Sequence, residues 1–223
     1  VDENGKFIHP DRLMTIFVKD ILGEREGGTE SERTVFYDVK CSMALEEVIY
    51  SSGGFPKMVR TGHSFMKREL KENPDSPLAG EMSGHFFLND RWPGFDDSLY
   101  NTARLLEIIA RESSPRDGGP KFSDWFDDLP NYASTGEAKV PLTQNRKETM
   151  DSVERIFSDM KYSSVDGVRV RYPEGWFLCR PSNTEPILVM RAEANDEEGL
   201  TKIKQDVEKR LGKIINLENF HNS

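Results

Sequence analysis

The sequence predicts an α/β layered domain followed by a small α+β domain in which helices pack on an antiparallel sheet. Up to about residue 130, short apolar runs rich in β-branched and aromatic residues alternate with segments of helical periodicity. Beyond Pro130, several strand-like runs follow one another between two amphipathic segments. A polar linker rich in Pro and Gly, residues 113–119, lies before this change of pattern. We therefore expect domains at 1–130 and 131–223, with the boundary near Asn131.

The first domain is expected to alternate strands and helices. Asn4-Gly5 predicts a hairpin turn, with a short strand at Phe7-Ile8. Pro10 suits the first turn of a helix, and apolar residues recur at helical spacing to about residue 22. The apolar run at 34–39 is typical of a buried strand. The other elements expected here are helices at 43–51, 65–70, 99–111 and 122–129 and strands at 56–60, 78–79 and 86–88.

The second domain is expected to contain more strands than helices. Asp166-Gly167 and residues 173–175 are turn signals that separate successive strands. The expected strands are 132–142, 161–164, 168–172, 176–180 and 187–194, and the expected helices are 146–159 and 197–215.

Composition restricts the classes of function. The 223 residues carry a formal net charge of -9, which argues against non-specific nucleic-acid binding but not against a local cluster of cations. No apolar run reaches membrane length and no signal peptide is visible, so we expect no membrane partner and a cytoplasmic location. Cys41 and Cys179 have no metal-ligand spacing and are interpreted as reduced thiols. The chain begins at Val1, and we expect it to start inside a longer protein.

Residues 80–85 form the first candidate binding motif. Two glycines flank Glu81, Ser83 and His85, which offer an acceptor, a hydroxyl and an imidazole. Such a set suits a polyol; the alternative is a polar turn before a strand. As a loop carboxylate, Glu81 is not expected to belong to the core.

Lys40, His63 and Glu81 each follow a predicted strand, where ligands bind in open α/β sheets. Taken alone, Lys40 could be a solvated loop lysine and His63 a neighbour of a helix N-cap. Asp96 and Asp97 are interpreted as caps of the helix that follows them.

Residues 180–186 form the second candidate motif, in a turn between two predicted strands. Arg180, Ser182, Asn183 and Thr184 offer a planar cation and several neutral donors, which is what a phosphate dianion requires. An ordinary turn rich in Ser, Asn and Thr explains the same residues equally well. Combined with a polyol-binding loop, the phosphate interpretation is favoured, and the ligand would be a sugar phosphate.

The two motifs and three further segments resemble the third and fourth domains of the α-D-phosphohexomutases, the phosphomannomutase/phosphoglucomutase family. The resemblance covers most of the chain in the order of the family, and residues 1–10 resemble the stretch that follows the Mg²⁺ loop of the family's second domain. Its motifs are Asp38-Val39-Lys40-Cys41-Ser42, Thr61-Gly62-His63-Ser64, residues 80–85, Arg91-Trp92-Pro93-Gly94-Phe95-Asp96-Asp97 and residues 180–186.

The resemblance implies a role for each motif. Glu81 and Ser83, with His85, would bind the sugar hydroxyls. Lys40 and His63 would be cations of the catalytic cleft, with Lys40 assisting proton transfer. Arg180, Ser182, Asn183 and Thr184 would bind the phosphate that is not transferred. The sugar loop resembles that of bacterial enzymes acting on both mannose and glucose phosphates.

The family transfers a phosphoryl group between the 1- and 6-positions of a hexose through a phosphoserine and a hexose 1,6-bisphosphate. Nothing in the sequence matches the phosphoserine loop or the Mg²⁺ loop of the family. The resemblance therefore implies a C-terminal fragment that has no metal site of its own and is inactive without its N-terminal domains. The alternative is a module that binds sugar phosphates without catalysis.

Overall fold

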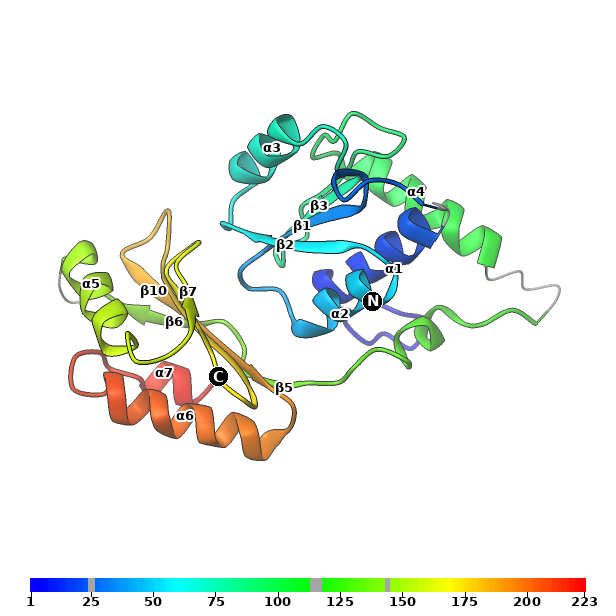
Figure 1. Ribbon diagram of the computed structural model, residues 1–223. Helices are drawn as coiled ribbons and strands as arrows, with labels where there is room; N and C mark the ends of the chain where they lie inside the picture. The colour runs from blue at the N-terminus through cyan, green and yellow to red at the C-terminus, as the bar shows by residue number, and fades with distance from the viewer. Residues whose placement is uncertain (24–26, 113–117, 143–144) are drawn as a thin grey trace. The chain divides into compact units, whose positions relative to one another are not determined.

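The computed structural model describes residues 1–23, 27–112, 118–142 and 145–223. They form two compact units, Val1–Pro130 and Asn131–Ser223 (Figure 1). The linker expected at 113–119 lies mostly outside the described residues.

The first unit is an α/β domain built on a four-stranded sheet of order β2-β1-β3-β4. β1 pairs in parallel with both β2 and β3, whereas β4 is antiparallel to β3. The strands are β1 (Thr34–Asp38), β2 (Phe55–Val59), β3 (Leu78–Gly80) and β4 (Phe86–Leu88). The helices are α1 (Pro10–Gly23), α2 (Met43–Ser51), α3 (His63–Glu72), α4 (Ser98–Glu112) and the 3₁₀ segments η1 (Ser31–Arg33) and η2 (Phe122–Phe126).

Alternate residues of β1 bury their side chains in different cores, because successive side chains of a strand point to opposite faces. Val35 and Tyr37 join the core that contains residues of α1, α2 and α4. Phe36 joins a smaller core with Met66 and Leu70 of α3. Helices therefore cover both faces of this sheet (Figure 1).

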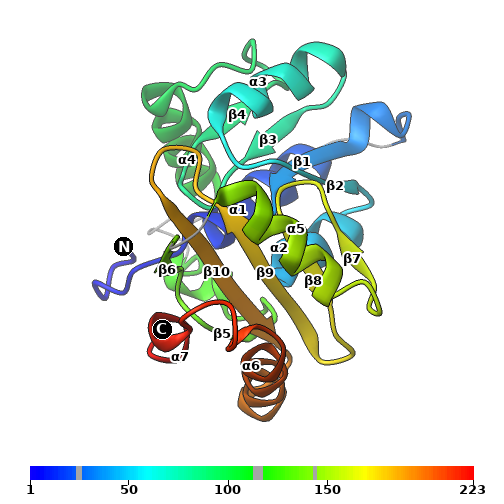
Figure 2. The same ribbon diagram turned by 90° about the vertical axis from the view of Figure 1, so that its left-hand side faces the viewer.

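The second unit is a small α+β domain with an antiparallel sheet of order β5-β10-β9-β8-β7, to which β6 adds by pairing with β10. β9 and β10 are the long central pair (Figure 2). Phe177 and Cys179 of β9 share one core with apolar residues of all three helices of the unit. The strands are β5 (Ala133–Ser134), β6 (Ala138–Pro141), β7 (Tyr162–Ser163), β8 (Val168–Arg171), β9 (Gly175–Pro181) and β10 (Ile187–Ala194). The helices are α5 (Arg146–Ile156), α6 (Glu197–Leu211) and α7 (Glu218–His221).

The predicted fold class is confirmed, and four local predictions are wrong. Phe7-Ile8 is not a strand, although Gly5 closes a turn onto Asp2 with an N–O distance of 3.1 Å. The run 132–142 is two short strands, and the helix predicted at 122–129 is the shorter η2. The last helix ends at Leu211 rather than at residue 215, and the short α7 follows it.

Two smaller expectations can also be compared with the structure. Cys41 and Cys179 are both buried and unpaired with each other. Across the described ranges, no helix combines the length and apolar character that crossing a bilayer requires.

Candidate functional site

The carboxyl ends of β1, β2 and β3 meet at one edge of the first sheet, because these strands are parallel. Lys40 lies two residues beyond β1, His63 lies four residues beyond β2, and Glu81 directly follows β3. Each of the three residues thus follows a strand, as predicted, and parallel pairing brings these strand ends to one edge. The stretch 80–85 is the connection between β3 and the antiparallel β4.

Glu81 connects two loops of this edge. Its Oε1 accepts a hydrogen bond from the backbone N of Gly62 at 2.5 Å, and its Oε2 accepts one from Ser83 Oγ at 2.9 Å. Backbone bonds from Glu81 N to His85 O and from Gly84 N to Glu81 O close the turn. Glu81 is only 2% exposed, so the expectation of a loop carboxylate outside the core is wrong.

Gly80 lies at a position of close approach to neighbouring side chains. A Cβ atom at this position would lie 2.5 Å from Sδ of Met14 on α1, well inside van der Waals contact. The Met14 side chain of helix α1 therefore packs directly against the start of the motif.

Asp38, the last residue of β1, organises the neighbouring loops; the sequence placed it in a motif of the family resemblance but gave it no role of its own. Its carboxylate accepts hydrogen bonds from Thr61 Oγ1 at 3.0 Å, from Lys40 N at 3.1 Å and from Cys41 Sγ at 3.3 Å. Asp38 is fully buried, and Lys40 is buried beside it in the chain. One feature of the sequence could have indicated this role: Asp38 is a carboxylate at the end of an apolar strand. Buried polar groups are nearly always hydrogen-bonded, so a carboxylate in such a place is expected to have several partners.

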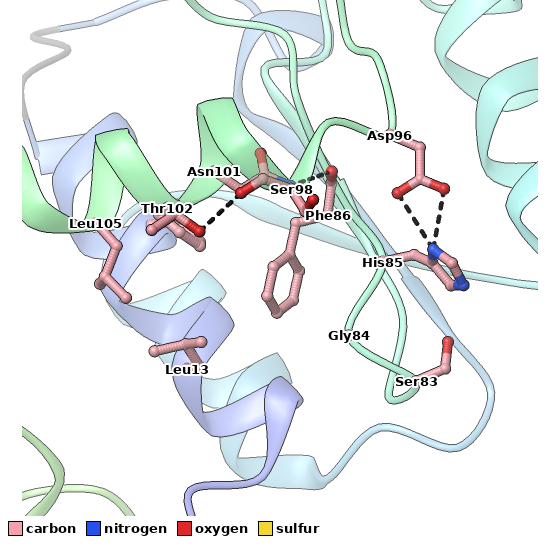
Figure 3. A pocket seen from close by; sticks show the side chains of 11 residues that line it. Leu13, Ser83, Gly84, His85, Phe86, Asp96, Ser98, Asn101, Thr102 and Leu105 are labelled. Carbon is pink, nitrogen blue, oxygen red and sulfur yellow. Dashed lines mark hydrogen bonds and ion pairs between the residues drawn. The ribbon is translucent and has the colours of Figure 1, made fainter. Parts of the chain in front are cut away.

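His85 and Asp96 lie in hydrogen-bond contact at one side of a cavity of about 500 Å³ (Figure 3). His85 Nδ1 lies 2.9 Å from Oδ2 and 3.1 Å from Oδ1 of Asp96. The cavity is also lined by polar groups of α4 and by apolar residues of α1, among them Ser98, Thr102 and Leu13.

The adjacent aspartates have different partners. The carboxylate of Asp97 accepts hydrogen bonds from the backbone N of Leu99 at 3.1 Å and of Tyr100 at 3.0 Å, so it caps α4 as predicted. Asp96 is directed to His85 instead, and the cap interpretation is wrong for this residue.

His63 is the first residue of α3, with Gly62 as the N-cap. Its ring centroid lies 6.0 Å from that of His85, and its Nδ1 lies 3.5 Å from Nζ of Lys67. The structure thus brings His63, Glu81, Ser83 and His85 into one cluster.

The second motif is the connection between β9 and β10. Ser182 Oγ accepts hydrogen bonds from the backbone N of Thr184 at 3.3 Å and of Glu185 at 3.2 Å, while Ser182 N donates to Ile187 O at 2.9 Å. The Ser182 hydroxyl is thereby used to shape the turn, whereas Asn183 and Thr184 are exposed. The turn is therefore held by its own hydrogen bonds, and the side chains of Asn183 and Thr184 lie at the surface.

Arg180 lies on β9 before this turn. Its Nε donates to Oδ2 of Asp166 at 2.7 Å. Its Nη2 has no hydrogen-bond partner within the described part of the chain. The Asp166 contact fixes the guanidinium, and Nη2, although buried, keeps an unused donor.

Two further cations lie near the turn and were not identified from the sequence. Lys139 Nζ is 3.2 Å from Oε2 of Glu185, and Arg146 Nη2 donates to the Glu185 carbonyl oxygen at 3.2 Å. They come from β6 and α5, far from the motif in the sequence, and no local pattern connects them with it.

The described ranges contain no group of three or more His, Cys, Asp or Glu side chains suited to a metal ion.

Comparison with known proteins gives the same family for both units. The family model "Phosphoglucomutase/phosphomannomutase, alpha/beta/alpha domain III" matches residues 9–131, and the model "Phosphoglucomutase/phosphomannomutase, C-terminal domain" matches residues 137–210.

Curated relatives are similar over nearly the whole chain. A phosphomannomutase/phosphoglucomutase of Pseudomonas aeruginosa is 42% identical over 209 residues, covering 92% of this chain and 42% of the relative. One from Pseudomonas syringae is 40% identical over 217 residues, covering 96% of this chain and 44% of the relative. The chain thus spans less than half the length of these relatives.

Solved structures extend the comparison. A phosphoglucomutase/phosphomannomutase family protein from Burkholderia thailandensis matches with a TM-score of 0.78 at 39% identity, covering 93% of this chain and 42% of that one. An N-acetylphosphoglucosamine mutase from Aspergillus fumigatus, solved with GlcNAc-6P and magnesium, shares the fold with a TM-score of 0.59 at 14% identity, over 94% of this chain and 48% of that one. The chain therefore belongs to the phosphoglucomutase/phosphomannomutase family, of which it contains domain III and the C-terminal domain.

Proposed function

We propose that this chain is the C-terminal part of a longer phosphohexomutase that interconverts hexose 1-phosphates and hexose 6-phosphates. The observation that carries the proposal is the cluster of His63, Glu81, Ser83 and His85 at one sheet edge of a domain that belongs to this family. The names of the curated relatives support mannose and glucose phosphates as substrates.

The first unit would bind the sugar. Ser83 donates its proton to Glu81, so its oxygen lone pairs are left to accept a hydrogen bond from a sugar hydroxyl. The Glu81 carboxylate has two oxygens and about four lone-pair sites, of which Gly62 N and Ser83 Oγ occupy two. It can therefore accept further hydrogen bonds from hydroxyls of a hexose. His85 would complete this set.

Lys40 and His63 would act near the phosphate that is transferred. Both lie at the carboxyl edge of the sheet, where a positive charge would stabilise the phosphoryl group during transfer. Lys40, held at its backbone by Asp38, is proposed to assist proton transfer at the reacting oxygen.

The second unit would bind the phosphate that is not transferred. Arg180 would donate from Nη2, and Asn183 and Thr184 would donate from the exposed turn that Ser182 shapes. The Ser182 hydroxyl can still donate its own proton while it accepts from the backbone.

The remaining components are assigned to the rest of the longer protein. The phosphoserine and the Mg²⁺ site would lie in N-terminal domains, and a hexose 1,6-bisphosphate would be the intermediate and activator. We propose a cytoplasmic location, which two buried cysteines that form no disulfide bond support.

The test is turnover of glucose 1-phosphate and mannose 1-phosphate by the longer protein and by the 223-residue chain alone. With Mg²⁺ and hexose 1,6-bisphosphate present, the longer protein should form the 6-phosphates and the chain alone should not. Binding of hexose phosphates by the longer protein without turnover would establish the alternative, a non-catalytic binding module. Turnover by the isolated chain would refute the division of roles.

A further inference from the structure

We propose that Asp96 is a positioning residue that holds His85 in the tautomer with its proton on Nδ1, so that Nε2 presents a lone pair to a hydroxyl of the bound sugar. The proposal rests on the proposed function for the identity of the ligand. The orientation and tautomer of His85 follow from the geometry alone.

The carboxylate determines which ring nitrogen carries the proton. Both oxygens of Asp96 lie within 3.1 Å of His85 Nδ1, and an ionised carboxylate can only accept hydrogen bonds. Nδ1 must therefore be the donor, and in the neutral imidazole Nε2 is then the acceptor. The opposite tautomer would place a lone pair of Nδ1 against the lone pairs of Asp96.

The backbone positions Asp96 for this contact. Asp96 forms an isolated antiparallel bridge with Phe87, so it lies beside β4, the strand that begins directly after His85. The side chains of His85 and Asp96 therefore approach each other from neighbouring segments of one sheet edge (Figure 3). Their exposed fractions, 44% and 26%, leave the ring accessible to a ligand.

Asp96 is not needed as a cap, because Asp97 supplies both hydrogen bonds to the start of α4. The two neighbouring carboxylates thus provide a matched pair of variants. Asp96→Asn changes the partner of His85, whereas Asp97→Asn removes the same charge one residue away and keeps an amide oxygen that can cap the helix.

The ring also lies in a polar environment that requires a defined donor and acceptor pattern. His63 is 6.0 Å away between ring centroids, and Ser83, with its proton directed to Glu81, is two residues before His85. Ser83 and Nε2 of His85 would both be acceptors, and Glu81 is an acceptor only. Such a cluster is suited to a ligand that supplies several hydroxyl donors, as a hexose does.

The direct test is the tautomer of His85, measured from ¹⁵N and ¹H correlations of the imidazole rings in the 223-residue chain at a pH where they are neutral. Wild type and Asp97→Asn should show His85 protonated on Nδ1. Asp96→Asn should shift the population toward the Nε2-protonated form, because the Asn amide can donate to Nδ1. An Nε2-protonated His85 in wild type, or identical tautomer populations in wild type and Asp96→Asn, would overturn the proposal.

The functional test uses the longer protein. Asp96→Asn should lower kcat/KM for glucose 1-phosphate by about tenfold to a hundredfold, the range known for loss of the partner that orients a metal-binding histidine. Asp97→Asn should change it less than about twofold. A shifted tautomer with unchanged kcat/KM would overturn the role assigned to Nε2. Lack of turnover in wild type would refute the proposed function, whereas the tautomer measurement does not depend on turnover.

Discussion

Replacing Glu81 by alanine should loosen the first unit as well as impair sugar binding. The carboxylate is 2% exposed and holds the backbone N of Gly62, the N-cap of α3, at 2.5 Å. Hydrogen bonds to charged groups contribute about 1.5–3 kcal/mol each to stability. The loss of stability should be confined to the loop that carries His63.

Amide hydrogen exchange of the 223-residue chain measures this effect residue by residue. A loss of about 1.5–3 kcal/mol corresponds to exchange roughly tenfold to a hundredfold faster at Gly62 and in the first turn of α3 in Glu81→Ala. Glu81→Gln keeps an acceptor for Gly62 N but not its charge, so exchange should increase by less than in Glu81→Ala. The amide of Met190, in the central strand β10 of the second unit, is the internal reference.

Unchanged exchange at Gly62 in Glu81→Ala would refute the reasoning, because it would mean that this buried carboxylate contributes nothing to the order of the His63 loop. Equal acceleration in both units would also contradict it, since the effect would then be global unfolding.

Three other predictions concern stability. Asp20→Asn should lower the free energy of unfolding of the first unit by about 3–5 kcal/mol in urea titration, because the buried carboxylate accepts from Arg104 at 2.5 Å and from Arg111. Gly167→Ala should destabilise the second unit in the same assay by at least about 1–2 kcal/mol, since φ is +77° and a Cβ would lie 2.4 Å from the Cys179 carbonyl oxygen. Burial raises the pKa of the Cys179 thiol to about 12. The unfolded chain therefore releases this proton first, and the contribution of Cys179 to stability should be complete below about pH 9 and fall above it by up to about 1.4 kcal/mol per pH unit. Cys179→Ala should remove that dependence in urea titrations at pH 8–10.

Elements with a local signal could be predicted from the sequence. The helical spacing of apolar residues in α1 and the continuous apolar run of β1 are each visible within a short stretch of sequence. The bounds predicted for these two elements agree with the structure to within one or two residues. The strand predicted at 132–142 failed because Thr135 leaves the strand pattern, exchanging hydrogen bonds with Ala192 through its backbone N and its Oγ1. Phe7-Ile8 has strand-like residues, but it has no strand partner in the described parts of the chain.

The candidate site was predictable in its residues but not in its connections. The sequence places Lys40, His63 and Glu81 after strands, and parallel pairing brings those strand ends to one edge. The contact between Glu81 and Gly62 spans 19 residues of sequence, and nothing local indicates it. Likewise, either of two adjacent aspartates can cap a helix, so only the pairing of Asp96 with β4 reveals that it turns to His85.

The most direct test of the central claim is calorimetric titration of the longer protein and its Arg180→Lys variant with glucose 1-phosphate, glucose 6-phosphate and glucose. In the structure the guanidinium donates from Nε to Asp166 while Nη2 has no partner in the described ranges. A lysine has a single nitrogen and cannot reproduce this forked geometry. We predict that the variant binds both phosphate isomers more weakly by about 1.5–3 kcal/mol, roughly tenfold to a hundredfold, with weak glucose binding unchanged. Loss of affinity for only one isomer, or for neither, would contradict the account, because the turn after β9 would then not be the binding site of the phosphate that is not transferred.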